Sequence, residues 1–306
     1  MRKFDQSREI ALFIDKLRSY RNISQEDFLF DIISMRQYRR YMNGDSTLSY
    51  LILDKLAKRL GFNAEFVIME LETEKVKQTQ AVNDLYNAVI SNNSDKSNDL
   101  FMSIDERHLI SDNDLLLFKH SKNMFDYFTK INSEFVTINK TKKLVDLDNL
   151  LKKRALTTSE LLILISFFHF DTFKDIHVIA EKLASYIDNN VTVVSGHNIR
   201  VLVLVLKELA RYFSITENYE KMLYYSNEGI KYSMAMRSFY LLDTLYYFAA
   251  AASHELNHIE KRNEYLFKCI SLLSMEDNQN KIAKYKDLFK ERFDIDIRDL
   301  TSKHHK

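Results

Sequence analysis

The segment ISMRQYRRYMNG, residues 33–44, determines how the N-terminal part of the chain folds. Serine at its second position and Gly44 at its end are typical helix boundaries, because serine often caps an N-terminus and glycine often follows the last turn. Tyr38 and Tyr41 are three residues apart, so they share one face and can pack inward. The segment therefore predicts a short helix with a buried aromatic face.

A second face of this helix carries positive charge. Arg36, Arg39 and Arg40 lie within five residues, and no acid occurs from residue 32 to residue 44. Arg36 and Arg40 share a face with Gln37 beside them. Arginine and glutamine can each form two hydrogen bonds to a base edge, and arginine also neutralises phosphate. The pattern fits a DNA-reading helix or, alternatively, a solvated basic face on an ordinary helix.

The composition indicates an all-α protein. The 306 residues include no proline and 4 glycines, and both residue types break or weaken helices. Hydrophobic residues make up 46% and charged residues 28%, as in globular chains of one large domain or two. The net charge of +1 gives no global attraction to nucleic acid or membrane, so any DNA binding must come from a local patch.

Three features predict a cytoplasmic location. A single cysteine excludes an intramolecular disulfide and fits a reducing compartment. The first residues, MRKFD, do not have the apolar core of a signal peptide. The longest apolar run, Leu245 to Ala252, is far too short to span a bilayer.

Five short helices are expected between Arg8 and Glu70. Apolar residues spaced by three and four predict the first, up to about Arg21. Serines at positions 24, 34 and 49 would cap the next three, and the fourth would stop at Gly61. The fifth would cover residues 64–70. A tight turn between the second and third helices makes this region a helix-turn-helix domain.

Residues 8–70 resemble the XRE-type, lambda-repressor-like DNA-binding domain. The resemblance rests on ISQ at 23–25 opening the second helix and on RY at 40–41 with NG at 43–44 closing the third. It also rests on LDKLAKRLG at 53–61 in the fourth helix.

The resemblance implies roles for residues of the second and third helices. In that family a glutamine at the position of Gln25 contacts a phosphate, and the major groove is faced by residues at the positions of Met35, Arg36, Gln37 and Arg39. The chain departs from the family pattern where Met42 replaces the usual glutamate and Arg39 the usual serine. The predicted DNA-binding residues are Gln25, Ser34, Met35, Arg36, Gln37, Arg39 and Arg40.

The rest of the chain is expected to form a second helical domain. A longer helix is predicted over residues 72–90, and the polar run at 91–98 is typical of a loop. We place the boundary near residue 71. This gives a DNA-binding domain over residues 1–71 and a second domain over residues 72–306.

Paired helices recur in the second domain. Tyr-Glu-Lys at 219–221 recurs 40 residues later as Ile-Glu-Lys at 259–261. This offset exceeds the tetratricopeptide period of about 34 but is of the same kind. Cys269 takes the position of Gly229, where helices approach closely, so we interpret it as a packing residue and not as a nucleophile. The sequence predicts a degenerate TPR-like α-solenoid, with a generic helical bundle as the alternative.

The order of these domains resembles the Rgg/PlcR-type peptide-pheromone regulators of low-GC Gram-positive bacteria. The likeness rests mostly on residues 219–273, which contain YYSNEGI, then SFYLL, then an alanine-rich helix. It implies a transcriptional regulator that acts as a homodimer on a palindromic operator in double-stranded DNA. It also implies a short signalling peptide, bound in the concave groove of the repeats, that switches DNA binding or activity in quorum sensing. No cofactor and no membrane partner are expected.

The first helix of each tetratricopeptide pair lines the groove. In this register Lys207 and Arg211 would point into it, one turn apart, and could hold a peptide carboxylate. The candidate peptide-binding residues are Asn198, Arg200, Lys207, Arg211, Tyr240, Thr244 and Tyr247. The alternative is that these are ordinary solvated helix residues. A TPR-like interaction scaffold without a peptide ligand also remains open.

The segment HELNH at 254–258 matches the zinc motif HExxH. On a continuous helix His254 and His258 would lie one turn apart and could bind zinc, with Glu255 as general base. The repeat register, however, ends the helix around residues 255–257. Lys261 and Glu264 also stand where the extended motif needs glycine and histidine. We therefore predict no metal site and no enzymatic activity, with a zinc metalloprotease as the less favoured alternative.

Overall fold

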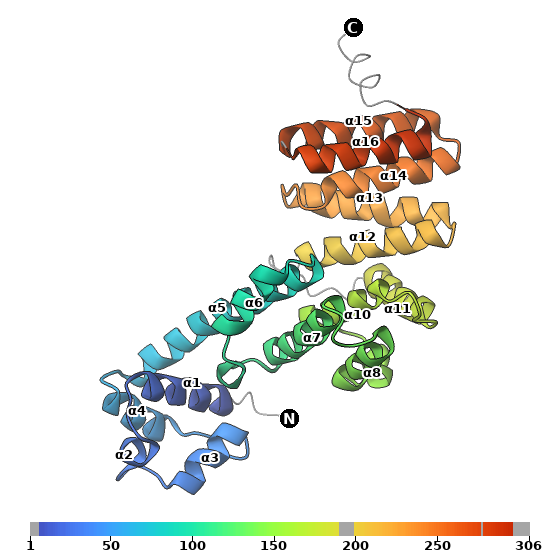
Figure 1. Cartoon of the computed structure of the whole chain (residues 1–306). Helices are drawn as coiled ribbons and strands as arrows, with labels where there is room; N and C mark the ends of the chain where they lie inside the picture. The colour runs from blue at the N-terminus through green and yellow to red at the C-terminus, as the bar shows by residue number, and fades with distance from the viewer. Residues whose placement is uncertain (1–5, 190–198, 277, 296–306) are drawn as a thin grey trace. The chain divides into compact units, whose positions relative to one another are not determined.

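The computed structural model describes residues 6–189, 199–276 and 278–295. Every regular element in these ranges is a helix (Figure 1), which confirms the predicted all-α fold. The chain divides into two compact units, residues 1–145 and 146–306. In the described ranges no helix is both long and apolar enough to cross a membrane.

The first unit contains the expected helix-turn-helix arrangement, in which α2 (Gln25–Leu29) is followed directly by α3 (Met35–Asn43) (Figure 1). Its helices are α1 (Ser7–Tyr20), α2 (Gln25–Leu29), α3 (Met35–Asn43), α4 (Tyr50–Arg59), α5 (Ala64–Ile90), α6 (Ser94–Ser103), the 3-10 turn η1 (Glu106–His108), α7 (Asp112–Phe128) and α8 (Glu134–Val145).

The predicted helix ends in this unit follow from local hydrogen bonding. Ser24, Ser34 and Ser49 each accept a hydrogen bond from a backbone amide in the first turn of α2, α3 and α4. Gly44 ends α3 with φ at +80°, a left-handed conformation that costs glycine little. The backbone amide after it donates to the carbonyl of Arg40 at 2.8 Å, which satisfies an otherwise unpaired helix end.

One core holds α1 to α5 together. Each large apolar side chain buried there contributes roughly 1.5–3 kcal/mol relative to an exposed one. The buried members of this core are Phe13, Ile14, Phe28, Leu29, Tyr38, Leu53, Leu56, Ala57, Leu60, Ala64, Val67, Leu71 and Ile110.

The region around residue 71 differs from the prediction of two separate helices, 64–70 and 72–90. A single helix, α5, runs from Ala64 to Ile90. No proline or glycine interrupts it, and Val67 and Leu71 are both fully buried in the core of the first five helices. The expected boundary near residue 71 therefore falls inside a continuous helix.

The polar run at 91–98 is also only partly a loop. Ser91 and Asn92 form a turn after α5, and Asn92 has φ at +56°. Asn93 then caps α6, which begins at Ser94, by accepting a hydrogen bond from the amide of Lys96 at 3.1 Å. The same polar residues that favour loops also favour helix N-termini, so the prediction of a loop through residue 98 was wrong.

The second unit contains α9 (Leu147–Lys152), α10 (Thr158–Ser166), the 3-10 turn η2 (Phe167–His169), α11 (Ile176–Asp188), α12 (Ile199–Ile215), α13 (Tyr219–Ala235), α14 (Leu242–Glu255), α15 (Ile259–Glu276) and α16 (Gln279–Phe293). Thr157 and Glu160 form the predicted capping box at the start of α10. Figure 1 shows α12, α13 and α14 stacked in chain order, with α15 and α16 together beyond α14, as in a TPR-like solenoid.

Small side chains allow neighbouring helices of the solenoid to approach closely. An added Cβ at Gly229 in α13 would lie 2.7 Å from Cδ2 of Leu245 in α14, well inside van der Waals contact. Cys269 in α15 is fully buried, and its Sγ lies 3.3 Å from the carbonyl oxygen of Asp243 in α14. Burial raises the pKa of this thiol well above its usual value. Cys269 is therefore a packing residue, as its repeat position predicted.

Candidate nucleic-acid interface and ligand face

Helix α3 has one buried face, and it is the face that the tyrosine spacing predicted. Tyr38 is 1% exposed and Tyr41 is 3% exposed. The hydroxyl of Tyr38 donates to Oδ1 of Asp15 at 3.3 Å, and its ring meets the ring of Phe28 edge-on. Burial, together with the charge on Asp15, raises the pKa of Tyr38. The phenol therefore stays protonated and anchors α3 against α1.

The outer face of α3 is cationic. Arg36, Arg39 and Arg40 are all exposed. Nη2 of Arg40 donates weakly to the carbonyl of Asp45 at 3.5 Å. Across residues 6–189, 199–276 and 278–295, no hydrogen bond or salt bridge occupies the guanidinium group of Arg36 or Arg39. Both groups are therefore available to a phosphate or a base edge.

Four other predicted DNA-binding residues are engaged within the first unit itself. Nε2 of Gln37 donates to Oγ of Ser46 at 3.0 Å, and Nε2 of Gln25 donates to Oδ1 of Asp15 at 3.1 Å. Ser34 caps α3, and Met35 packs partly buried against the core. Each glutamine still has an acceptor oxygen and a second N–H for another partner.

Arg59 is a positioning residue that the sequence did not single out. Its Nη1 donates to the carbonyl oxygens of Asp27 and Phe28 at 3.1 Å each, and also to that of Phe30. These carbonyls lie at the C-terminal end of α2, where a positive charge is favourable. Arg59 thus fixes α2 against α4. An arginine near the end of an amphipathic helix carries no sequence signal for this role.

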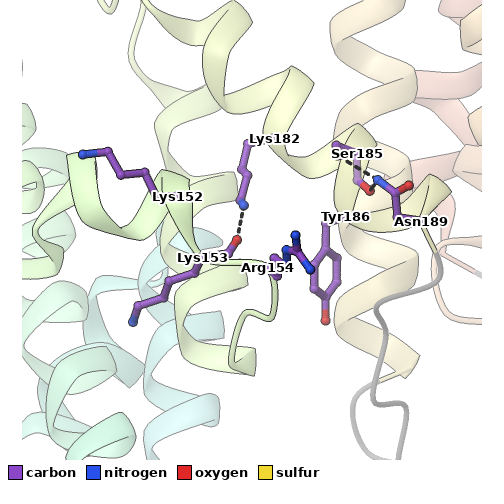
Figure 2. Close-up of a pocket in the computed structure, with 7 residues that line it drawn as sticks. All are labelled: Lys152, Lys153, Arg154, Lys182, Ser185, Tyr186 and Asn189. Atoms are coloured by element: carbon purple, nitrogen blue, oxygen red, sulfur yellow. Dashed lines mark hydrogen bonds between the residues drawn. The ribbon is translucent and has the colours of Figure 1, made fainter.

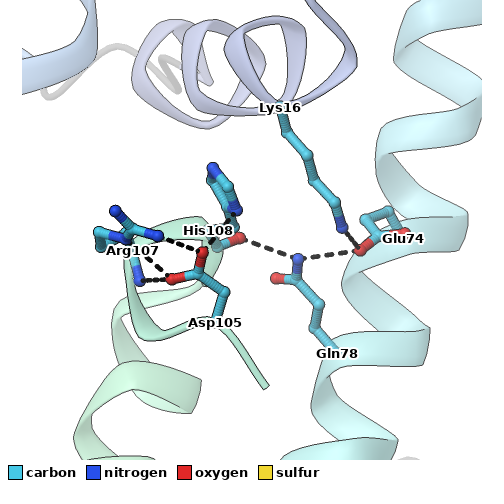
Figure 3. Close-up of polar contacts among 6 residues, drawn as sticks. All are labelled: Lys16, Glu74, Gln78, Asp105, Arg107 and His108. Carbon is cyan, nitrogen blue, oxygen red and sulfur yellow. Dashed lines mark hydrogen bonds and ion pairs between the residues drawn. The ribbon is translucent and has the colours of Figure 1, made fainter. Parts of the chain in front are cut away.

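A polar cluster joins the helix-turn-helix helices to the segment that precedes α7 (Figure 3). Lys16 in α1 forms a salt bridge with Glu74 in α5, and Glu74 accepts from Nε2 of Gln78 at 3.0 Å. Gln78 also donates to the carbonyl of His108 at 2.9 Å. Next to it, hydrogen bonds from Arg107 lower the pKa of Asp105 to about 2.

In the second unit a buried carboxylate lies between the two predicted groove cations. Glu208 is 4% exposed, and its oxygens lie 2.6 Å from Nζ of Lys207 and 2.7 Å from Nε of Arg211. Nη2 of Arg211 also donates to the carbonyl of Phe168 at 2.8 Å. Burial raises the pKa of Glu208, but the two cations outweigh it, so that the pKa is lowered.

This arrangement changes what Lys207 and Arg211 can do. One of their two charges is already balanced by Glu208, which the groove prediction did not include. Burial also lowers the pKa of the nearby His169, so this histidine adds little positive charge near neutral pH. The cluster of Lys207, Glu208 and Arg211 therefore carries a net charge of about +1, enough to favour a single carboxylate.

A second predicted pair is brought together nearby. The guanidinium carbon of Arg200 in α12 lies 6.0 Å from the ring centroid of Tyr240, just before α14. Tyr240 is 36% exposed and the adjacent Phe239 is 73% exposed. These side chains offer a cation and aromatic surface to a ligand. Asn198, also predicted, lies outside the described residues.

Thr244 and Tyr247 do not line an open surface as expected. Tyr247 is 9% exposed, and its ring stacks on that of Phe289 in α16, 6.1 Å between centroids. Oγ1 of Thr244 lies 3.0 Å from the hydroxyl of Tyr285, also in α16. Tyr285 and Phe289 of α16 thus cover the N-terminal half of α14, and the repeat register did not anticipate this cover.

The HExxH motif lacks the geometry of a zinc site. Helix α14 ends at Glu255 and α15 begins at Ile259, so His254 and His258 do not share a helix. Asn257 between them has φ at +59°, and Nδ1 of His254 lies 3.2 Å from Nη1 of Arg262. In the described part of the chain, no group of three or more histidine, cysteine or acidic residues is placed to hold a metal.

Comparison with known proteins gives similarity in structure only. No protein-family model matches the sequence, and no curated protein matches it either. Three solved structures illustrate the similarity in fold.

A protein from Listeria monocytogenes EGD-e with a proposed role as a transcriptional regulator is 12% identical, with a TM-score of 0.54 over 94% of this chain and 97% of that one. PlcR from Bacillus thuringiensis in its apo form is 16% identical, with a TM-score of 0.52 over 89% and 98%. The competence regulator ComR from Streptococcus vestibularis, bound to its cognate signalling peptide XIP, is 16% identical, with a TM-score of 0.50 over 92% and 98%. The chain thus has the predicted fold, a helix-turn-helix region followed by TPR-like helices.

Proposed function

We propose that the chain is a sequence-specific DNA-binding transcriptional regulator whose repeat helices bind a short signalling peptide. One observation carries the DNA-binding part. Arg36 and Arg39 are exposed on the capped helix α3 of a helix-turn-helix and have no hydrogen-bond or salt-bridge partner among the residues that the structure describes. The fold shared with PlcR and ComR supports the peptide-responsive part.

In this proposal α3 is the recognition helix. Arg36 reads base edges in the major groove, because a guanidinium can form two hydrogen bonds to guanine. Arg39 and Arg40 neutralise backbone phosphates. Gln37 and Gln25 contribute through the groups that their hydrogen bonds to Ser46 and Asp15 leave free. Ser34 and Met35 act by fixing the start of α3.

The peptide is proposed to bind on α12 and the start of α14. The net positive cluster at Lys207, Glu208 and Arg211 would pair with its carboxylate. Arg200 and Tyr240 would contact its backbone and side chains. Tyr247 and Thr244 would act indirectly, by fixing α16 against α14.

Several further assignments belong to this proposal. Residues 1–71 read DNA and residues 72–306 sense the peptide, although α5 crosses that boundary. The protein works in the cytoplasm and has no catalytic activity. It acts as a homodimer, because two copies of α3 can then reach successive major grooves about 34–36 Å apart. Peptide binding shifts the balance between DNA-competent and incompetent states by favouring one of them.

Selection of bound DNA from a random pool tests this function. We expect the full chain to enrich a two-fold symmetric sequence, with an affinity that falls steeply as salt rises. Addition of culture medium containing secreted peptides should change the enrichment. Retention of DNA without sequence preference would contradict sequence-specific reading, and a lack of salt-dependent DNA retention would favour an interaction scaffold. A response to medium that persists when Arg211→Ala replaces the wild type would contradict the peptide site.

A further inference from the structure

A positively charged pocket lies in the second unit, between the end of α9 and the C-terminal half of α11. It encloses about 430 Å³, a size within the range of small-molecule sites. Figure 2 shows its lining residues, which are Lys152, Lys153, Arg154, Lys182, Ser185, Tyr186 and Asn189. None of the predicted functional residues is among them.

The charges in this basic pocket are largely unbalanced. Of its four cations, Lys153 pairs with Glu160 at 2.6 Å. Throughout the residues that the structure places, no acid lies within salt-bridge distance of Lys152, Arg154 or Lys182. Three uncompensated cations therefore line one pocket in a chain whose net charge is only +1. Such a cluster of positive charge raises the local concentration of anions.

These cations do not all belong to one solvent-exposed stretch of sequence. Lys182 comes from a different helix and donates to the backbone carbonyl of Lys153 (Figure 2). Its amine is partly buried without an acid, and this desolvation lowers its pKa. Arg154 and the ring of Tyr186 both line the pocket. The pocket thus combines a planar guanidinium, an amine fixed by the backbone and an aromatic wall.

We propose that the basic pocket binds a small phosphorylated molecule, a function beyond DNA reading and peptide sensing. A phosphate group carries nearly two negative charges at neutral pH and several acceptor oxygens, which suits three cations better than one carboxylate does. Arg154 would bind two of its oxygens through the guanidinium fork. Lys152 and Lys182 would supply point charges. Ser185, Tyr186 and Asn189 would contact the remainder of the molecule.

Calorimetric titration of the full chain with inorganic pyrophosphate tests this proposal, at ionic strength held constant with sodium chloride. We expect saturable binding that weakens about tenfold or more in Arg154→Gln and in Lys182→Gln, because each removes a charge-assisted hydrogen bond. Lys174→Gln is the matched control, since it removes an exposed lysine of the same unit that does not line the pocket.

Using both Arg154→Gln and Lys182→Gln keeps the test informative if one of these variants misfolds. Lys182 bonds the backbone of the loop after α9, whereas Arg154 is exposed, so a folding defect confined to Lys182→Gln leaves Arg154→Gln informative. Absence of saturable binding, or equal weakening in Lys174→Gln, would overturn the site. Malonate binding as tightly as pyrophosphate would overturn the preference for phosphate. Loss of affinity for a random DNA duplex in both variants, without pyrophosphate binding, would show a DNA-backbone contact instead.

Discussion

Oε1 of Gln78 accepts a hydrogen bond from the backbone amide of Ile110 at 2.9 Å, while Nε2 of the same side chain donates to the carbonyl of His108, also at 2.9 Å. Ile110 is 1% exposed and belongs to the core of the first five helices. One amide side chain from the middle of α5 therefore holds the segment before α7 against the helix-turn-helix helices.

We predict that Gln78→Ala lowers the free energy of unfolding by about 1–3 kcal/mol, because it leaves two backbone groups without partners. Chemical denaturation followed by circular dichroism measures the change. Gln80→Ala is the matched control, since Gln80 is exposed on the same helix and its side chain donates to Asp84 one turn away. Equal effects of the two substitutions would show that the hydrogen bonds from Gln78 to residues 108 and 110 do not add to the free energy of unfolding.

Arg36→Ala is predicted to weaken operator binding by about 1–3 kcal/mol and to relax base preference at one position in each half-site. The side chain has no partner to lose within the described residues, so stability should change by less than about 0.5 kcal/mol. Fluorescence anisotropy on the selected operator and on single-base variants measures both effects. Lys96→Ala removes an equal charge from an exposed position on α6. If Lys96→Ala weakened operator binding as much as Arg36→Ala, α3 would not be the helix that reads the bases.

Sequence reasoning worked best where a local signal sets the structure. Ser24, Ser34 and Ser49 cap helices with their own side chains, and Gly44 ends α3 because its left-handed φ is favourable for glycine. These features fix the helix-turn-helix from short segments of chain. The buried tyrosine face of α3 followed in the same way, from spacing alone.

The parts that sequence reasoning missed depend on contacts between distant segments. No local signal at residue 71 could show that Leu71 would join the same core as Ile110 and so favour one long α5. Glu208 neutralises charge on Lys207 and Arg211 only because its carboxylate points between them in the folded chain. Tyr247 is buried only because α16 packs against it. The run Lys152 to Arg154 was visible in the sequence, but Lys182 comes from another helix.

Gly229→Ala is predicted to destabilise the second unit by about 1–2 kcal/mol. The new methyl group would lie 2.7 Å and 2.9 Å from the two Cδ atoms of Leu245, and Leu245 is fully buried with little room to rotate. Overpacking of this kind costs about 1–3 kcal/mol, which exceeds the gain of about 0.5–1 kcal/mol from removing a helical glycine. Thermal unfolding measures the net effect.

The partner substitution supplies the control for this prediction. Leu245→Ala alone should destabilise by about 2–5 kcal/mol, because it leaves a cavity. Adding Gly229→Ala to it should cost nothing further or restore some stability, because the methyl group then enters free space. Strictly additive losses would show that α13 and α14 do not meet at this position.

Glu208→Gln is predicted to lower the free energy of unfolding at pH 7 by about 1–3 kcal/mol, because Lys207 and Arg211 lose their buried counter-charge. The pKa of Glu208 is lowered in the folded state. Its ionised form therefore contributes fully above the ordinary glutamate pKa of about 4.3, and this contribution is lost as pH falls through the lower folded value. The difference in free energy of unfolding between wild type and variant should accordingly narrow below about pH 4.

Urea titrations across this pH range measure that difference, with the exposed Glu291→Gln as control. A difference that stayed constant with pH would mean that the ion pairs of Glu208 do not stabilise the second unit.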